Sequence, residues 1–128
     1  MKRLLIDTHV LMWWLADDPR LGSYARELIG NERNETYVSA ASAWEISIKK
    51  ALGKLEAPDN LHFLMEEEGF STLPITFFHG ERAGSLPALH RDPFDRMLIA
   101  QAQAEGLDIV TADERMASYA VRTVSAWQ

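Results

Sequence analysis

The chain has 128 residues, of which 47% are hydrophobic and 25% charged, and this is the size and composition of one ordinary globular domain. No stretch is polar or repetitive enough for a disordered segment or a repeat array, and the absence of cysteine excludes a disulfide framework and thiolate chemistry. A net charge of −6 argues against the basic surface of a typical nucleic-acid binder. We therefore expect one domain, residues 1–128, in a reducing cytoplasm.

The segment RLLIDTHVLMWWLA, residues 3–16, is apolar except at its centre, where three polar residues stand at positions 7–9. They split the apolar run of a would-be signal peptide, and no small-residue cleavage site follows. The seven apolar residues after them fall far short of the ~20 that span a bilayer. Residues 3–6 predict a buried strand and residues 8–16 a helix, so Asp7 lies at the junction.

Expected strands and helices alternate along the rest of the chain. Further helices are predicted over residues 19–29, 40–52, 61–68, 77–83, 94–105 and 111–117. Further strands are predicted over residues 36–39, 71–74, 107–110 and 121–124. This alternation indicates a three-layer α/β/α domain with a central, mainly parallel sheet of about five strands.

Four acidic side chains fall just after an expected strand or in the first turn of an expected helix: Asp7, Glu45, Asp95 and Asp113. Each has a plain explanation when taken alone. The stretches 42–45 and 111–114 fit the capping-box pattern, Asp7 suits the cap of the first helix, and Asp95 suits a helix dipole. Because ligands of parallel α/β sheets bind at the carboxyl ends of the strands, we expect the four to share that edge, Asp95 joining if its helix starts there.

The repulsion between four negative charges in such a cluster must be compensated. At ~5 Å and an effective dielectric constant of ~20, each like-charge pair costs about 3 kcal/mol, so six pairs approach 20 kcal/mol. That exceeds the total stability of a typical domain, about 5–15 kcal/mol. The cluster therefore holds either protons or cations, and an all-oxygen ligand set favours hard ions such as Mg²⁺ or Mn²⁺.

Four segments in this order carry a family resemblance: LLIDTHVLMWWL, SAWEISIK, DPFDRMLIAQAQAEG and IVTADERM. Together they resemble a PIN-domain ribonuclease of the VapC type, the toxin of a type II toxin–antitoxin pair. The resemblance covers essentially the whole chain and implies a PIN-like fold in which Asp7, Glu45, Asp95 and Asp113 hold one or two Mg²⁺ or Mn²⁺ ions. We assign Asp95 rather than Asp92, since Asp92 before Pro93 fits a helix N-cap, and Asp92 remains a second candidate.

The resemblance implies metal-assisted hydrolysis of RNA phosphodiester bonds, with products that carry a 5′-phosphate and a 3′-hydroxyl. Asp7 and Asp95 would be the principal ligands, Asp113 would complete a second metal position, and Glu45 would bind metal or orient water. It also implies a small antitoxin partner, whose C-terminal segment covers the active site, and a homodimer.

Other residues near these acids have two interpretations each. Thr8 either holds Asp7, touches a phosphate or caps the helix, and His9 is better explained as a solvated group than as a general base. Tryptophans could stack on bases, but the core or a dimer contact is the better explanation for Trp13, Trp14 and Trp44. Basic residues that could hold the RNA backbone, or simply face solvent, are Lys49, Lys50, Arg91, Arg96 and Arg115.

Three alternatives to a metal-dependent ribonuclease remain. An aspartate-dependent phosphatase needs a second Asp two residues after Asp7, where this chain has His9. A receiver-like phosphoacceptor needs an acidic pair after the first strand and a late Lys, and neither is present. A catalytically silent PIN-fold binding module is disfavoured because all four acids are there.

Overall fold

The computed structural model describes all 128 residues, and its strands confirm the expected sheet. The strands are β1 (Arg3–Ile6), β2 (Glu35–Ser39), β3 (Ser71–Leu73), β4 (Asp108–Thr111) and β5 (Thr123–Ser125). They form one sheet in the order β3-β2-β1-β4-β5, and every neighbouring pair is parallel. The sheet is thus fully parallel.

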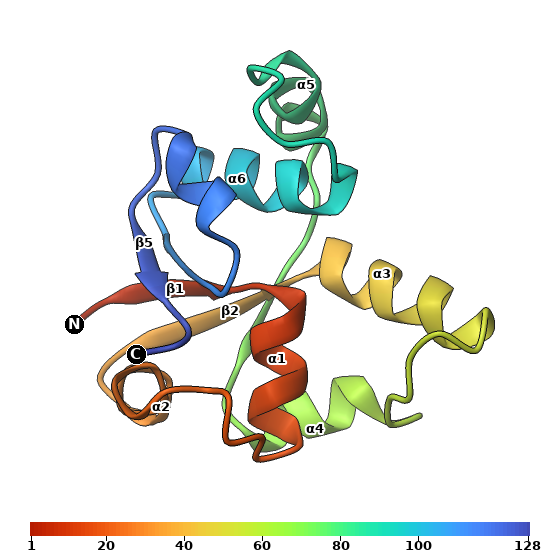
Figure 1. Ribbon diagram of the computed structural model, residues 1–128, viewed down its shortest axis with the longest axis vertical. Coiled ribbons are helices and arrows are strands. Elements are labelled where there is room, and N and C mark those ends of the chain that lie inside the picture. The colour runs from red at the N-terminus through yellow and green to blue at the C-terminus, as the bar shows by residue number, and fades with distance from the viewer.

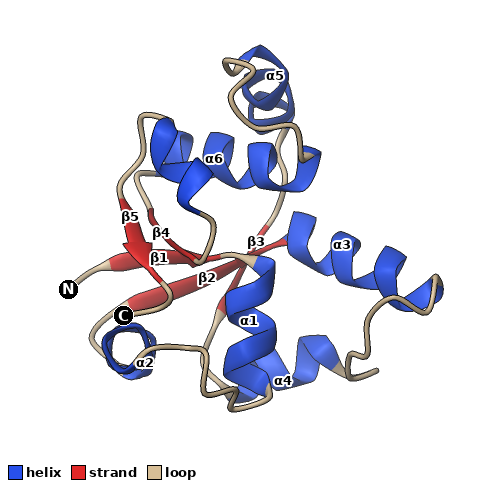
Figure 2. Ribbon diagram, viewed as in Figure 1, coloured by secondary structure: helices blue, strands red, loops and turns tan.

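Helices cover both faces of this sheet, as Figures 1 and 2 show. They are α1 (Thr8–Leu15), α2 (Ser23–Gly30), α3 (Ala40–Ala51), α4 (Leu61–Glu67), α5 (Phe77–Ser85), α6 (Pro93–Glu105) and the 3₁₀ helix η1 (Glu114–Ser118). In Figure 1, α1, α2 and α4 lie below the strands, whereas α6 lies above them with α5 beyond it. The layers are therefore α/β/α. None of the helices has the length and apolar character needed to cross a membrane.

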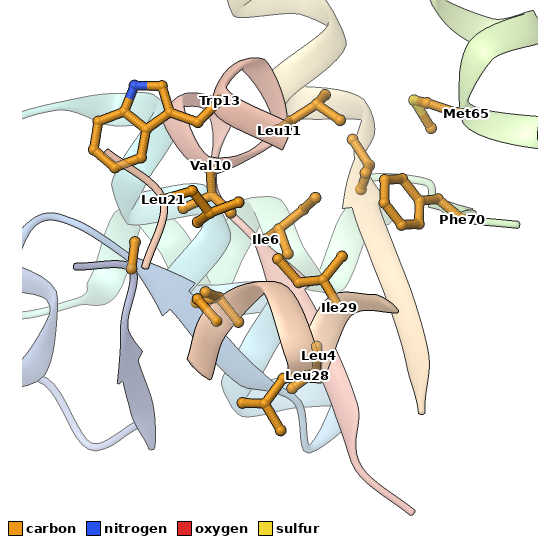
Figure 3. Close-up of a cluster of buried hydrophobic side chains, with 14 of the residues drawn as sticks. Leu4, Ile6, Val10, Leu11, Trp13, Leu21, Leu28, Ile29, Met65 and Phe70 are labelled. Atoms are coloured by element: carbon orange, nitrogen blue, oxygen red, sulfur yellow. The ribbon is translucent and has the colours of Figure 1, made fainter. Parts of the chain in front are cut away.

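The alternation of side chains along β1 explains the two cores. Leu4 and Ile6 pack into one buried cluster, while Leu5 between them packs into the other, because successive strand residues point to opposite faces. Figure 3 shows the first cluster, where residues of β1 meet side chains of α1 and α2: Leu4, Ile6, Val10, Leu11, Leu28 and Ile29. The second cluster joins the sheet to α6 and η1. A strand buried on both faces accounts for the apolar run before Asp7.

Helix α2 begins at Ser23, although the sequence favoured a start four residues earlier. The Asp18 carboxylate instead accepts a hydrogen bond from the backbone N–H of Arg20, which closes a turn. The Gly22 N–H then donates to the Ala126 carbonyl oxygen over 2.8 Å. The segment after β5, far away in sequence, therefore contacts the residue directly before this helix.

Two elements near the C-terminus also differ from expectation. The expected helix over 111–117 is the short 3₁₀ helix over residues 114–118. The last strand occupies residues 123–125 rather than 121–124, because it pairs in register with β4, Val124 lying opposite Val110. Both shifts leave the alternation of strands and helices intact.

The carboxyl ends of β1, β2 and β4 meet at one edge of the sheet. Ile6, the last residue of β1, pairs with Val38 on one side and Val110 on the other. The N-terminus of α6 also lies toward this edge, above the start of α1 in Figure 1. The fold therefore delivers the four acidic segments to a common region, as the parallel arrangement predicts.

Candidate metal centre

Asp7 lies between β1 and α1 and is only 4% exposed. Its Oδ1 accepts a hydrogen bond of 2.9 Å from the backbone N–H of Val10, so it caps α1 as expected. Its Oδ2 accepts a 2.5 Å hydrogen bond from the hydroxyl of Thr111, at the end of β4. Burial raises the pKa of Asp7 even though these hydrogen bonds favour the ionised form. The Asp7 carboxylate thus connects the start of α1 to the end of β4.

Asp95 and Asp113 approach each other through the imidazole of His90. The His90 Nε2 is hydrogen-bonded to Asp113 Oδ2 at 2.9 Å and lies 3.0 Å from Asp95 Oδ2. Arg115 adds a fork of hydrogen bonds, its Nε to Asp113 Oδ1 at 3.0 Å and its Nη2 to Asp113 Oδ2 at 2.9 Å. Arg115 foremost, with His90, holds the pKa of Asp113 well below its usual range.

The backbone determines which nitrogen of His90 faces the acids. The Asp92 backbone N–H donates to His90 Nδ1 over 3.1 Å. The proton of the neutral ring must therefore be on Nε2, where it is directed at the carboxylates. In this form His90 is a donor that positions Asp113 beside Asp95, and it has no lone pair on Nε2 to offer a metal.

Glu45 is placed differently from the three aspartates. It is 4% exposed. Its Oε1 accepts a 2.7 Å hydrogen bond from the hydroxyl of Thr8, and its Oε2 pairs with Lys49 Nζ at 2.6 Å. The hydroxyl of Ser42 lies 3.0 Å from that of Thr8. Thr8 therefore holds Glu45, a partner that the sequence had not suggested.

Neither expected capping box is formed. Ser39 caps α3 by accepting from the Ala41 N–H, because the helix starts directly at the end of β2. Glu45 consequently lies in the second turn rather than the first. Asp113 itself caps η1 by accepting from the Arg115 N–H. The interpretation of Asp92 as the cap of α6 is confirmed, since its Oδ1 accepts from the Phe94 N–H over 2.8 Å.

A cleft of about 610 Å³ gathers most of these acids. Its walls include four aspartates, Asp7, Asp92, Asp95 and Asp113, whereas Glu45 is not among its lining residues. Burial foremost, then the charges of Asp92 and Asp7, raises the pKa of Asp95 to about 7. The charge of Glu45 adds to this rise. Acidic side chains from several elements of the fold thus surround Asp95.

This donor set fits a divalent cation. Carboxylate oxygens of Asp95 and Asp113 lie within 4.8 Å of each other, and Asp7 and Asp92 face the same cleft. The available ligand atoms are carboxylate oxygens, which hard cations prefer. Burial and the charges of Asp92 and Asp7 disfavour the ionised form of Asp95. A divalent cation at this place would supply the missing positive charge.

The basic residues singled out in the sequence are mostly engaged within the protein. Lys49 pairs with Glu45, Lys50 with Asp59, and Arg115 with Asp113. Arg96 donates to backbone carbonyl oxygens that include those of Ala83, Leu86 and Pro87. Arg91 is exposed and has no carboxylate partner. The site therefore has no broad basic groove, in agreement with the net charge.

Two residues of the cleft region escaped the sequence analysis, His90 and Trp127. His90 stands two positions before Asp92, so its place in HRDPFD was a local signal that it lies near the acidic residues. Its contact with Asp113, 23 positions away, is not local. Trp127 follows the last strand and lines the cleft beside Trp13, a residue expected in the core and only 8% exposed. Neither contact has a signature in the neighbouring sequence.

Comparison with known proteins agrees with this architecture. The family model of the PIN domain matches residues 4–122. A curated relative, Ribonuclease VapC22 of Mycobacterium tuberculosis, is 32% identical over 131 residues, which cover 99% of this chain and 100% of the relative.

Solved structures are similar at lower identity. VapBC2 from Rickettsia felis, bound to a DNA fragment from its promoter, has a TM-score of 0.70 and 12% identity, covering 95% of this chain and 97% of the other. A toxin–antitoxin complex from Klebsiella pneumoniae has a TM-score of 0.68 and 20% identity, covering 98% of each chain. These similarities support the fold.

Proposed function

This chain belongs to the PIN-domain family, and on that premise we propose that it is a metal-dependent endoribonuclease, the toxin of a toxin–antitoxin pair. The observation that carries the proposal is the convergence of Asp7, Asp95 and Asp113 on one acidic cleft. A relative that covers the whole chain is named a ribonuclease, which supports RNA as the substrate. All of residues 1–128 form the nuclease domain in this proposal, since the sheet extends from Arg3 to Ser125.

Mg²⁺ or Mn²⁺ is the cofactor that we propose, one or two ions per site, held by Asp7, Asp95 and Asp113. When bound, the cation supplies Lewis-acid chemistry, lowering the pKa of the attacking water and neutralising charge on the leaving oxygen. Glu45 serves as a ligand or orients the water in this proposal, as its rigid attachment to Thr8 and Lys49 allows.

The other residues of the site act by holding these carboxylates. Thr111 and the Val10 N–H each engage one oxygen of Asp7, which prevents rotation of that carboxylate. His90 and Arg115 restrain Asp113 in the same way. Such preorganisation places the ligand oxygens before the substrate arrives, so that little reorganisation is needed during the reaction.

Cleavage of a mixed RNA pool by the purified protein tests the proposal. We expect cleavage with Mg²⁺ or Mn²⁺, none with EDTA, and products that carry a 5′-phosphate. Asp95→Asn should lose at least about 100-fold in rate, given the weight of single electrostatic groups in such sites. Asp59→Asn is the matched control, because Asp59 is an exposed carboxylate paired with Lys50 outside the acidic cleft. A folded wild-type protein that cuts nothing in either metal would support a silent binding module instead.

The proposed partner is a small antitoxin protein, and we further propose a homodimer that acts on RNA in the cytoplasm. The structural neighbours include toxin–antitoxin complexes, which supports the pairing. Light scattering of the purified chain, alone and with the product of an adjacent gene, should give the mass of two copies in the first case and of a mixed complex in the second. A monomeric mass in the first case would contradict the dimer.

A further inference from the structure

One exposed aromatic ring borders the acidic cleft. Trp127 lies just after β5 and remains 55% exposed, although it lines the same cleft as Asp7, Asp95 and Asp113. The only other aromatic side chain along this cleft apart from His9 is Trp13, which is buried. Trp127 is thus the one aromatic side chain of this cleft, apart from His9, with a large exposed surface.

Contacts on the protein side hold the Trp127 ring in place. Its indole Nε1–H donates to the Ala112 carbonyl oxygen over 3.2 Å. Its centroid lies 5.0 Å from that of Trp13, with the two rings inclined at 56°. Trp13 is itself covered by the guanidinium of Arg20, 5.0 Å from the ring centroid. The exposed indole is thus preorganised rather than loosely attached to the surface.

The hydrogen bond to Ala112 also fixes the ring relative to the metal ligands. Ala112 directly precedes Asp113, so Trp127 is bonded to the very segment that carries a proposed ligand. A phosphate located at Asp7, Asp95 and Asp113 would therefore have an aromatic surface beside it. A base attached to a neighbouring nucleotide is the part of an RNA chain that such a surface binds.

The cleft offers an RNA chain little positive charge. Arg115 is the only Lys or Arg among the lining residues, and its guanidinium is bound to Asp113. With a net charge of −6, the protein has little long-range attraction for a polyanion. Stacking on an aromatic ring does not depend on positive charge, so it adds affinity in a cleft of this kind.

We propose that Trp127 is the stacking platform for an unpaired nucleobase of the RNA substrate, next to the phosphate at the acidic cleft. This inference rests on the proposed ribonuclease function and adds a substrate-binding residue to it. The platform accepts single-stranded segments, since bases within a duplex have no free face, and it accepts different bases because each has a π-face.

Equilibrium binding tests the proposal directly. The probes are a fluorescein-labelled single-stranded oligouridylate and an abasic ribose-phosphate chain of the same length, both in Mg²⁺. Every protein carries Asp95→Asn to keep the RNA intact. We expect Trp127→Ala to weaken binding of oligouridylate by roughly 5- to 150-fold, the cost of one base–aromatic stack. Binding of the abasic chain should not change, and Trp127→Phe should restore most of the affinity.

Steady-state cleavage by Trp127→Ala and Trp127→Phe, each in a protein that retains Asp95, distinguishes a role in substrate binding from a structural role. Loss of the platform should raise KM and leave kcat within about twofold, whereas disturbance of the Asp113 segment would lower kcat. Phe63→Ala is the control, since Phe63 is an exposed aromatic residue on α4 that lines none of the cleft. Equal losses for oligouridylate and the abasic chain, or no loss for either, would overturn the platform.

Failure of the platform and failure of the nuclease give different results. If the protein cuts RNA and Trp127→Ala leaves KM unchanged, the platform is wrong and the nuclease stands. If the protein cuts nothing but binds oligouridylate through Trp127, the platform stands and the catalytic proposal is wrong. If oligouridylate does not bind at all, or the ring instead proves to contact a protein partner in the bound complex, the platform is wrong.

Discussion

His90 connects two segments that supply metal ligands. Its Nε2 lies within 3.0 Å of both Asp95, in the first turn of α6, and Asp113, after β4. Its Nδ1 accepts a hydrogen bond from the Asp92 backbone N–H, so a single ring contacts the Asp92 backbone and the carboxylates of Asp95 and Asp113. Residues that orient ligands in this way act on the cation through the carboxylates rather than by direct contact.

Removing this ring should weaken the metal site. We expect His90→Ala to reduce Mn²⁺ affinity by roughly 10- to 100-fold, because residues that orient metal ligands typically contribute that much. Titration calorimetry on the folded variant measures the change. His62→Ala is a suitable control, since His62 is an exposed histidine of α4 paired only with Glu66. Unchanged affinity in His90→Ala would show that Arg115 alone is enough to hold Asp113.

Asp95 should make the metal-free protein sensitive to pH. Its pKa is raised to about 7 in the folded state, above its ordinary value of 3.8. The folded protein therefore binds the proton more tightly, and stability is fully present below about pH 4 and is lost as the pH rises through about 7. Burial of Asp7 acts in the same direction. The lowered pKa of Asp113 acts only below its usual range, outside this interval.

Thermal unfolding in EDTA measures this effect. We expect Tm to fall by several degrees between pH 5 and pH 8, and Asp95→Asn to flatten most of that slope because the amide carries no charge. At pH 8 without metal, the variant should be more stable than the wild type. A wild-type Tm that rises over this interval would contradict the electrostatic account of the cleft.

At the scale of elements, the start of α2 and the segment after β5 depend on each other. A Cβ on Gly22 would lie 2.0 Å from the carbonyl carbon of Gln128, closer than any real contact. The N–H of Tyr24 donates to the Gln128 carbonyl oxygen over 2.7 Å. Gly22 is therefore required for close approach, although its φ of −68° is open to any residue. This approach also keeps Trp127 beside the cleft.

Gly22→Ala should break this contact. Either the helix or the last segment must move, which costs about 1–3 kcal/mol of unfolding free energy by analogy with overpacked cores. Urea unfolding measures the loss, and the exposed Gly80→Ala in α5, where a Cβ meets nothing within 4 Å, provides the control. If Gly22→Ala is as stable as the wild type, the packing of this segment is looser than the structure has it.

At the scale of the whole molecule, a divalent cation should stabilise the fold. The cleft joins residues from α1, α6 and the ends of β1 and β4, so a cation bound there links separate parts of the chain. At 100 times the dissociation constant, binding adds about 2.7 kcal/mol to the free energy of unfolding. We expect Mg²⁺ or Mn²⁺ to raise Tm by several degrees at pH 8, and EDTA to reverse the rise.

The Asp95→Asn variant separates this effect from general salt stabilisation. Its Tm should respond to Mg²⁺ much less than that of the wild type, while Na⁺ at the same ionic strength should affect both proteins equally. An equal response of both proteins to Mg²⁺ would place the cation elsewhere.

Local patterns in the sequence determined most of the architecture. Apolar runs, helix periodicity and stop signals predicted the strands and helices, because these signals extend over a few neighbouring residues. The parallel arrangement followed from their alternation, and with it came the edge shared by Asp7 and Asp113. The cap of α6 at Asp92 was equally local and is confirmed.

Tertiary structure alone decided the partners within the site. Thr111 reaches Asp7 across 104 positions, Thr8 reaches Glu45 across 37, and His90 reaches Asp113 across 23. The residues next to each partner in the sequence do not predict these contacts, since the contacts depend on how strands and helices pack. For the same reason, only the folded chain brings Glu45 against Thr8 and sets Trp127 beside the acidic cleft.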